Sequence, residues 1–238
     1  MPDTALLVTC EHAVNHVPDP WRSLFADNPT ILATHRAWDP GALPLARKIA
    51  EAFSAPCFAA RISRLLIDHN RSPHNRGLWS DFSRDLPAAQ KTVLLRNYYQ
   101  PFRKKTEDWI AAQIAAGDSV LHLSVHTFTP VLSGRPRMVD IGVLYDTARS
   151  AEVTAGRELC RRLRNSLPHL RVRCNQPYRG SSDGHLTSYR HRYSDRLYCG
   201  IELEISQALD RGAIDDLAEA VRQALSRSCA LKRSNRAH

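Results

Sequence analysis

The sequence predicts an α/β fold, in which strands alternate with helices along the chain. Apolar runs of strand length are followed by stretches with helical periodicity, and this order recurs in both halves. The 238 residues are 43% hydrophobic and 24% charged, which is typical of a globular protein and excludes disorder as the main state. No internal repeat or convincing linker divides the chain. We therefore expect one domain over residues 1–228 and a basic, mobile tail over residues 229–238.

The first half of the chain begins with a short apolar run, 5–9, which we expect to be a buried strand. A helix is expected over 40–53, where Asp39 is a favourable N-cap residue ahead of proline at the first helical position. The remaining elements expected in this half are extended segments at 57–62 and 65–67, an irregular segment at 70–88, and a helix at 93–116, bent at Pro101 and ending at Gly117.

The second half repeats the alternation. Its expected strands are 120–125, 139–145, 170–174 and 198–205. Its expected helices are 151–165 and 213–225, which have amphipathic patterns. A loop rich in glycine and serine is expected at 180–184.

The chain is basic, with 33 Lys and Arg against 24 Asp and Glu, a net charge of +9. The arginines are spread along the chain, and the compact basic run is 232–236, near its end. This distribution favours a basic enzyme that attracts anionic substrates over a nucleic-acid-binding protein.

The cysteines and the apolar segments indicate the compartment. The six cysteines form no CxxC pair, which is typical of reduced thiols rather than a disulfide framework or a zinc knuckle. The apolar stretches are too short to span a membrane, and no basic flank precedes the first of them as in a secretory signal. We expect a cytoplasmic protein that binds neither membrane nor nucleic acid.

Three polar residues stand where expected strands end or nearly end. His12 comes just after the expected strand 5–9, His126 follows the expected strand 120–125, and Glu204 lies near the end of the expected strand 198–205. Sites in α/β sheets collect at the carboxyl ends of strands. Two imidazoles and a carboxylate are the minimum set for a mononuclear zinc hydrolase, which also needs an open position for water. The alternative is that each histidine is a hydrogen-bonded structural group.

Two further segments carry polar residues that could reach a cleft. The stretch 63–71 delivers Asp68, Asn70 and Arg71, and the guanidinium of Arg71 could clamp a substrate carboxylate or pair with an aspartate to fix the loop. Glu202 and Glu204 share one face of a strand, so a metal, an arginine or a raised pKa should accompany them if they are buried. The alternative is an edge strand with both groups in water. The remaining histidines, including His69, His74, His185 and His191, are expected in loops.

Six segments occur in order along residues 5–210: Cys10–Pro18, His35–Ala42, Ser63–Arg71, Ser124–Pro130 followed by Gly142–Tyr145, Asn175–Tyr178 and Ile201–Ile205. Together they resemble the N-formylglutamate amidohydrolase family. Each motif alone is modest, but their order is hard to produce by chance.

The resemblance implies a zinc-carboxypeptidase-like fold (phosphorylase/hydrolase-like), with three α/β/α layers and a mixed, mostly parallel sheet. It implies that His12 and His126 are ligands of a divalent metal, most simply zinc. The third ligand is open, because Asn15 stands where zinc carboxypeptidases place a glutamate. Asp39 is preferred and Glu11 is the second choice. Glu204 matches the family's strand carboxylate and is expected to be the general base.

The resemblance also implies the substrate, a small anionic N-acyl amino acid. The expected reaction is hydrolysis of N-formyl-L-glutamate to L-glutamate and formate, in amino-acid catabolism. Asn70 and Arg71 resemble the pair that grips the substrate α-carboxylate in carboxypeptidases, and Tyr178 is a further expected substrate contact. Two alternatives remain: a peptidase or amidase of the same fold acting on peptide or cell-wall amides, and a non-catalytic, basic nucleic-acid-binding domain.

Overall fold

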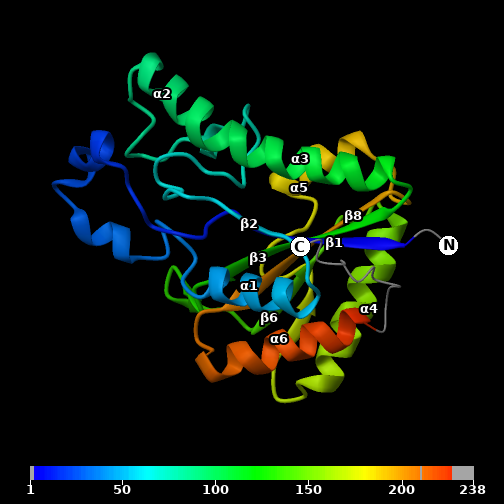
Figure 1. The fold of residues 1–238 in the computed structure, drawn as a ribbon. Coiled ribbons are helices and arrows are strands. Elements are labelled where there is room, and N and C mark those ends of the chain that lie inside the picture. The colour runs from blue at the N-terminus through cyan, green and yellow to red at the C-terminus, as the bar shows by residue number, and fades with distance from the viewer. Residues whose placement is uncertain (1–2, 210, 227–238) are drawn as a thin grey trace.

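The computed structural model describes residues 3–209 and 211–226, and these form three layers (Figure 1). Within this part of the chain, six strands make one sheet in the order β2-β1-β3-β8-β6-β7. Helices α1, α4 and α6 cover one face, and α3 and α5 cover the other. Neighbouring strands are parallel except β6 and β8, which are antiparallel. The predicted α/β class with a mixed, mostly parallel sheet is confirmed.

The strands of the large sheet agree with the expected apolar runs to within a few residues. They are β1 (Thr4–Cys10), β2 (Cys57–Ala59), β3 (Ser119–Phe128), β6 (Ile141–Leu144), β7 (Val172–Cys174) and β8 (Tyr198–Ser206). A separate two-stranded hairpin pairs β4 (Val131–Leu132) with β5 (Arg135–Pro136).

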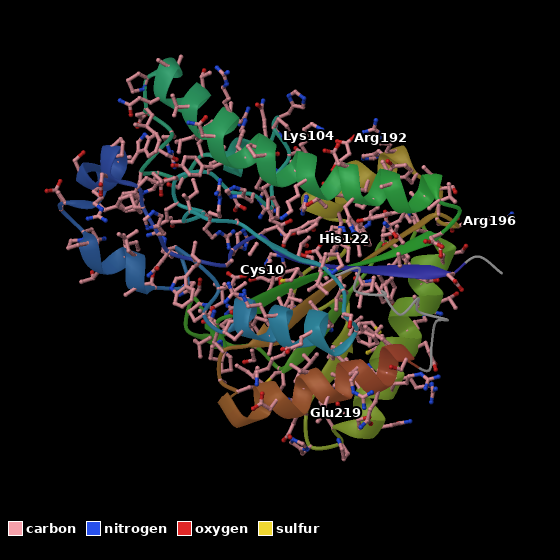
Figure 2. All side chains as sticks on the ribbon, in the orientation of Figure 1. Cys10, Lys104, His122, Arg192, Arg196 and Glu219 are labelled. Carbon is pink, nitrogen blue, oxygen red and sulfur yellow. The ribbon has the colours of Figure 1, made fainter. Side chains whose placement is uncertain are left out.

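The helices are α1 (Ala42–Ala52), α2 (Ala88–Leu94), α3 (Gln100–Ala115), α4 (Ser150–Ser166), α5 (His185–Arg192) and α6 (Arg211–Ser226). They bury apolar side chains in the core, while many of their charged side chains are exposed; Glu152 of α4 and Arg190 of α5 are buried. Figure 2 shows Lys104 on α3 and Glu219 on α6 pointing outward on opposite sides of the molecule, whereas His122 lies between the sheet and α3. In the described residues, no helix is both long and apolar enough to span a membrane.

The two central strands have one apolar face and one polar face, and this alternation decides where the site can form. On one face, Leu123 and Val125 of β3 and Leu203 of β8 are fully buried in the main core beneath α1, α4 and α6. On the other face of these strands are His126 and Glu204, which are directly paired across the sheet. Burial therefore brings an imidazole and a carboxylate together on the side of α3 and α5.

Three local predictions were wrong, each for a nearby physical reason. A bend was expected at Pro101, but the irregular part of the helix comes before it, as a π-helical turn over Leu95–Tyr99. This is the turn whose carbonyl groups the ring of Pro101 would crowd in a regular α-helix. Leu65 and Leu66 lie in a turn packed in a second apolar cluster, not in a strand. No helix was expected after the 180–184 loop, yet α5 begins directly at its end. The helix is too short to show an apolar periodicity in the sequence. The predicted tail at 229–238 lies outside the described residues.

Candidate functional site

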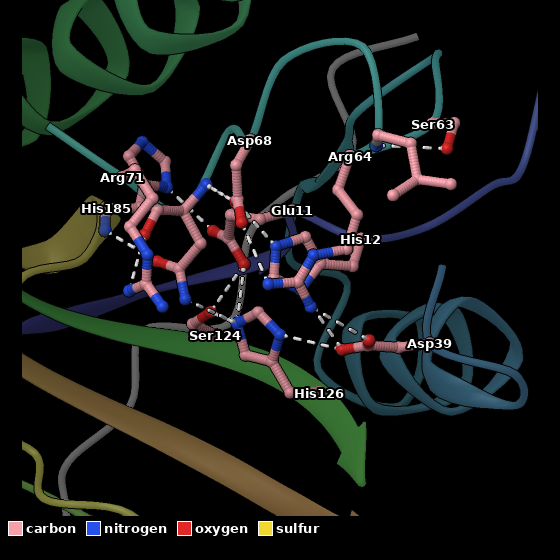
Figure 3. A network of polar contacts seen from close by, with 12 residues as sticks. Glu11, His12, Asp39, Ser63, Arg64, Asp68, Arg71, Ser124, His126 and His185 are labelled. Atoms are coloured by element: carbon pink, nitrogen blue, oxygen red, sulfur yellow. Dashed lines mark hydrogen bonds and ion pairs between the residues drawn. The ribbon is translucent and has the colours of Figure 1, made fainter. Parts of the chain in front are cut away.

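Three side chains that are far apart in sequence converge at the carboxyl ends of β1 and β3. Nδ1 of His126 lies 3.0 Å from Oδ2 of Asp39, and Nδ1 of His12 lies 3.3 Å from the same oxygen. All three residues are buried, and one donor atom from each lies within 4.8 Å of the others. Figure 3 shows both imidazoles turned toward Asp39. The three form a compact set of potential metal ligands.

Asp39 reaches this point because of the turn that precedes α1. Its backbone N–H donates to the carbonyl of His12, at 2.9 Å, which ties this turn to the end of β1. The predicted N-cap role of Asp39 was wrong, because α1 begins after Gly41, whose φ of 89° is a conformation that favours glycine. The carboxylate of Asp39 is thereby free to face the histidines. Burial alone would raise its pKa, but the two imidazoles outweigh burial and hold the pKa of Asp39 well below its usual range.

A second buried carboxylate stands behind His12. Oδ1 of Asp68 lies 2.7 Å from Nε2 of His12, and Oδ2 of Asp68 accepts from Arg64 at 2.8 Å. The guanidinium of Arg64 also lies 3.2 Å from Nδ1 of His12. Nε2 of His12 is thus held by a carboxylate, while Nδ1 faces both the guanidinium of Arg64 and the carboxylate of Asp39.

His126 is held in the same way by Glu11. Its Nε2 lies 3.1 Å from Oε2 of Glu11 and 3.0 Å from Oγ of Ser124, while its Nδ1 faces Asp39. Burial opposes a charge on this ring, but Asp39 and Glu11 outweigh it and raise the pKa of His126 well above its ordinary value. Glu11 thus contacts the far nitrogen of His126, so the geometry favours Asp39 over Glu11 as the third ligand.

Glu204 faces the same space from β8. It is 7% exposed, and its Oε2 has no hydrogen-bond partner among the described residues. Burial raises the pKa of Glu204 to about 8; His126 opposes the shift, and the carboxylates of Asp39 and Glu202 add to it. Burial likewise raises the pKa of Glu202, two residues earlier on the same face. A raised pKa and an unsatisfied oxygen make Glu204 a candidate for contact with a ligand.

The polar groups surround a cavity of about 220 Å³, which His12, Asp39, His126 and Glu204 all line. The predicted substrate contacts Asn70, Arg71 and Tyr178 line it as well. Nη1 of Arg71 donates to the backbone carbonyl of Asp183 at 2.7 Å, so the guanidinium is held at the wall. Tyr178 is at the rim, with 43% of its surface exposed. The structure thus brings together all seven residues predicted for the site.

One glycine allows the far wall of this cavity to form. A Cβ on Gly142 of β6 would lie 2.0 Å from the carbonyl oxygen of Gln176 and 3.2 Å from Cβ of Glu204. A side chain at this position is therefore excluded, and the loop that carries Tyr178 can lie directly on β6 beside Glu204.

The N-formylglutamate amidohydrolase family model matches residues 4–209 of this chain. The chain belongs to the N-formylglutamate amidohydrolase family. A solved structure from Agrobacterium tumefaciens has 30% identity and a TM-score of 0.75, and the match covers 95% of this chain and 91% of that one. N-formylglutamate amidohydrolase from Ralstonia eutropha JMP134 has a TM-score of 0.71 at 17% identity, over 96% and 95% of the two chains, which shows a shared fold. No curated protein matches the sequence significantly.

The site of this family member fits a divalent metal ion. Two imidazoles and one carboxylate are the donor set of many catalytic zinc sites, which leave one position open. Both rings direct Nδ1 toward Asp39 and have Nε2 against a buried carboxylate, the arrangement in which an outer carboxylate orients a metal-binding histidine. The unpartnered Oε2 of Glu204 faces the same cavity.

Sequence reasoning missed several residues that support this family member's site. Asp68 was expected to reach a cleft, but its role beside His12, and that of Arg64 in the same segment, could not be read from spacing. The prediction of loop histidines was wrong for His185 and His191, which lie in α5, and His69 and His185 are both buried. The signal that could have found His185 is the glycine before it, followed by a run of basic residues that suits a helix C-terminus.

Glu11, His122 and His185 form a second buried cluster in the family fold, with ligand atoms within 4.8 Å of one another. Both nitrogens of each of these rings are already engaged. His122 contacts Thr9 and Tyr198, at 2.8 Å each. His185 contacts Glu11 at 2.7 Å and Tyr189 at 2.8 Å. Burial lowers the pKa of His122 to about 3, and His185 adds to the shift. A satisfied network of neutral rings supports the fold here rather than a second ion.

The buried, neutral His122 should make stability depend on pH. The unfolded chain takes up a proton at His122 below about pH 6.5, whereas the folded protein resists it until about pH 3. Stability therefore falls as the pH falls through this window, by about 1.4 kcal/mol per unit from this group. Between pH 7 and pH 5, His122→Gln should lose about 2 kcal/mol less than the wild type in urea unfolding. The exposed His74→Gln should behave as the wild type, and an unchanged slope in His122→Gln would contradict the assignment.

Proposed function

We propose that this protein is a zinc-dependent amidohydrolase that converts N-formyl-L-glutamate and water to L-glutamate and formate. The observation that carries the proposal is the convergence of His12, Asp39 and His126 in one small cavity with Glu204, whose Oε2 lacks a partner among the described residues. Family membership supplies the reaction class, hydrolysis of a linear amide. The net charge of +9 suits a dianionic substrate.

In this mechanism His12, Asp39 and His126 hold the divalent cation, which would supply Lewis acidity to a water and to the amide carbonyl. A positive charge in the cavity would lower the pKa of Glu204 and leave it ionised at neutral pH. Glu204 then accepts a proton from the attacking water and delivers it to the nitrogen of the leaving amine. The carbon–nitrogen bond breaks, and the acyl group leaves as formate.

Cationic side chains on the cavity wall orient the substrate and stabilise charge. Arg71 and Asn70 are proposed to hold the α-carboxylate, which places the amide over the cation. Arg64, whose guanidinium lies 3.2 Å from Nδ1 of His12, is proposed to donate to the carbonyl oxygen as negative charge develops there. Such a donor contributes about 3–4 kcal/mol to transition-state stabilisation when it is well placed.

The size of the cavity favours a small substrate over a peptide or a cell-wall strand. A volume of about 220 Å³ lies below the roughly 300–1,000 Å³ of sites that enclose drug-sized ligands. The cavity therefore suits a single N-acylated amino acid.

The proposal is tested with the purified protein, loaded with one equivalent of Zn²⁺ and assayed on matched substrates. N-formyl-L-glutamate, N-acetyl-L-glutamate, N-formyl-L-leucine and a glutamate-containing dipeptide separate the acyl group, the side chain and the peptide bond. We expect formate release to be fastest from N-formyl-L-glutamate and to stop when a chelator removes the metal. Cleavage of the dipeptide alone would favour the peptidase alternative, and no hydrolysis by folded, loaded protein would refute the proposal.

A further inference from the structure

Glu11 is a fully buried carboxylate that lies behind His126, beneath the cavity. Each of its oxygens has two partners. Oε1 accepts from Oγ1 of Thr9 at 2.6 Å and from Nδ1 of His185 at 2.7 Å. Oε2 accepts from Oγ of Ser124 at 2.6 Å and lies 3.1 Å from Nε2 of His126. All four partners are groups that can donate a hydrogen bond, so Glu11 is an acceptor with no free position.

His185 links this carboxylate to the wall that faces the substrate. With Oε1 of Glu11 as the acceptor, Nδ1 of His185 carries the hydrogen, and Nε2 accepts from Tyr189 one turn later in α5. The backbone N–H of His185 donates to Oδ1 of Asn70 at 2.6 Å. That contact decides the orientation of the amide: Oδ1 of Asn70 faces α5, and Nδ2 lies 3.4 Å from Nε2 of His126, beside the closer contacts of Nε2 with Ser124 and Glu11.

We infer that Glu11 and His185 form one positioning unit, which sets both the ring of His126 and the amide of Asn70. The inference rests on the proposed function, in which His126 holds the cation and Asn70 holds the substrate carboxylate. Through Oε2, Glu11 keeps the hydrogen of His126 on Nε2 and leaves Nδ1 for the cation. Through Oε1, it holds His185 at the start of α5, where the backbone orients Asn70. Cation binding and substrate binding therefore depend on the same buried carboxylate.

The contacts of Glu11 differ from those of Asp68, the carboxylate that holds His12. Asp68 also accepts from a ligand ring, and its Oδ1 accepts from the backbone N–H of Asn70 at 2.9 Å, but its other oxygen contacts the partly exposed Arg64. Glu11 is fully buried, and its contacts are with the hydroxyls of Thr9 and Ser124 and the imidazoles of His126 and His185. Replacing Glu11 by Gln puts an amide N–H₂ against groups that donate, so at least one contact must turn away.

The test uses Glu11→Gln and His185→Gln, with Glu152→Gln as the matched control. Glu152 is equally buried, and its contacts are with Arg190 and Arg149 rather than with a cavity histidine. Zn²⁺ affinity is measured by competition with a chromophoric chelator, and geometry by the visible spectrum of the Co²⁺ form. We expect Glu11→Gln to lower Zn²⁺ affinity by about 10–100-fold and to change the Co²⁺ spectrum. His185→Gln should raise KM for N-formyl-L-glutamate more than it lowers kcat, and Glu152→Gln should keep the wild-type affinity.

The outcomes separate this inference from the proposed function. If wild-type protein binds Zn²⁺ and folded Glu11→Gln binds it equally with the same Co²⁺ spectrum, the positioning unit is refuted and the proposed function stands. If wild-type protein takes up no divalent ion, the proposed function fails. The ¹⁵N chemical shifts of the His126 ring then decide the inference: loss of the wild-type protonation at Nε2 in Glu11→Gln supports it, and unchanged shifts overturn it.

A second variant is used if Glu11→Gln does not fold. Ser124→Ala removes one donor to Oε2 of Glu11 and is expected to weaken Zn²⁺ binding several-fold. Wild-type Zn²⁺ affinity in Ser124→Ala would count against the positioning unit.

Discussion

Replacing Glu204 with Gln is expected to lower kcat for N-formyl-L-glutamate by about 10²–10⁴-fold while the protein keeps its Zn²⁺. The amide has nearly the shape of the carboxyl group, but it cannot take the proton of the attacking water. The carboxylate it replaces is 7% exposed and has one oxygen without a partner among the described residues, so few existing contacts are lost. Zn²⁺ should stay because Glu204 is not among the three residues proposed as ligands. Steady-state kinetics and metal analysis of the same preparation measure both effects.

The control for Glu204→Gln is the same substitution at Glu202. Both carboxyls are buried on one face of β8 and line the cavity, but Glu204 pairs across the sheet with His126, whereas Glu202 pairs with Ser124. The proposed base is the one beside the ligand, so kcat should fall further in Glu204→Gln than in Glu202→Gln. Near-wild-type turnover in Glu204→Gln, or a larger loss in Glu202→Gln, would remove Glu204 from its assigned role.

The sequence could predict the strand ends because burial leaves a local pattern. In β3 and β8 the apolar positions alternate with polar ones, and a polar group at a buried position, such as His126 or Glu204, needs a reason to be there. Because parallel strands bring their carboxyl ends to one edge, residues 114 positions apart, His12 and His126, could be placed together before any contact was known.

The contacts between loops could not be predicted, because they depend on how separate segments pack. Glu11 is next to His12 in sequence, yet the chain turns so that its carboxylate contacts the far nitrogen of His126. Asp39, 27 positions from His12, supplies the facing oxygen instead. Glycine before His185 and basic residues after it indicate a short helix, but they give His185 no role, since its importance lies in a backbone contact with Asn70, 115 positions away. Spacing identifies residues that can act, but only packing decides which nitrogen faces which carboxylate.

Removing the facing carboxylate should have the second large effect: Asp39→Asn is expected to lose Zn²⁺ affinity by more than the roughly 10–100-fold that follows loss of an outer partner. An amide oxygen carries no net charge to balance the cation, and it is a weaker ligand. Hydrolysis should fall to background at Zn²⁺ concentrations that saturate the wild type. Saturation should also stabilise the wild type, by about 4 kcal/mol when free Zn²⁺ is 1,000 times Kd, and should not stabilise the variant at the same concentration. Thermal unfolding with and without Zn²⁺ measures this difference.

Asp68→Asn is the matched comparison, because the two aspartates contact opposite nitrogens of one ring. Asp39 faces Nδ1 of His12 at 3.3 Å, and Asp68 faces Nε2 at 2.7 Å; both carboxylates are buried. If the cation lies on the Nδ1 side, Asp39→Asn must weaken binding more than Asp68→Asn, which keeps all three proposed ligands. The reverse order would place the cation on the Nε2 side, between His12 and Asp68. The ranking of these two variants therefore tests which face of His12 the metal occupies.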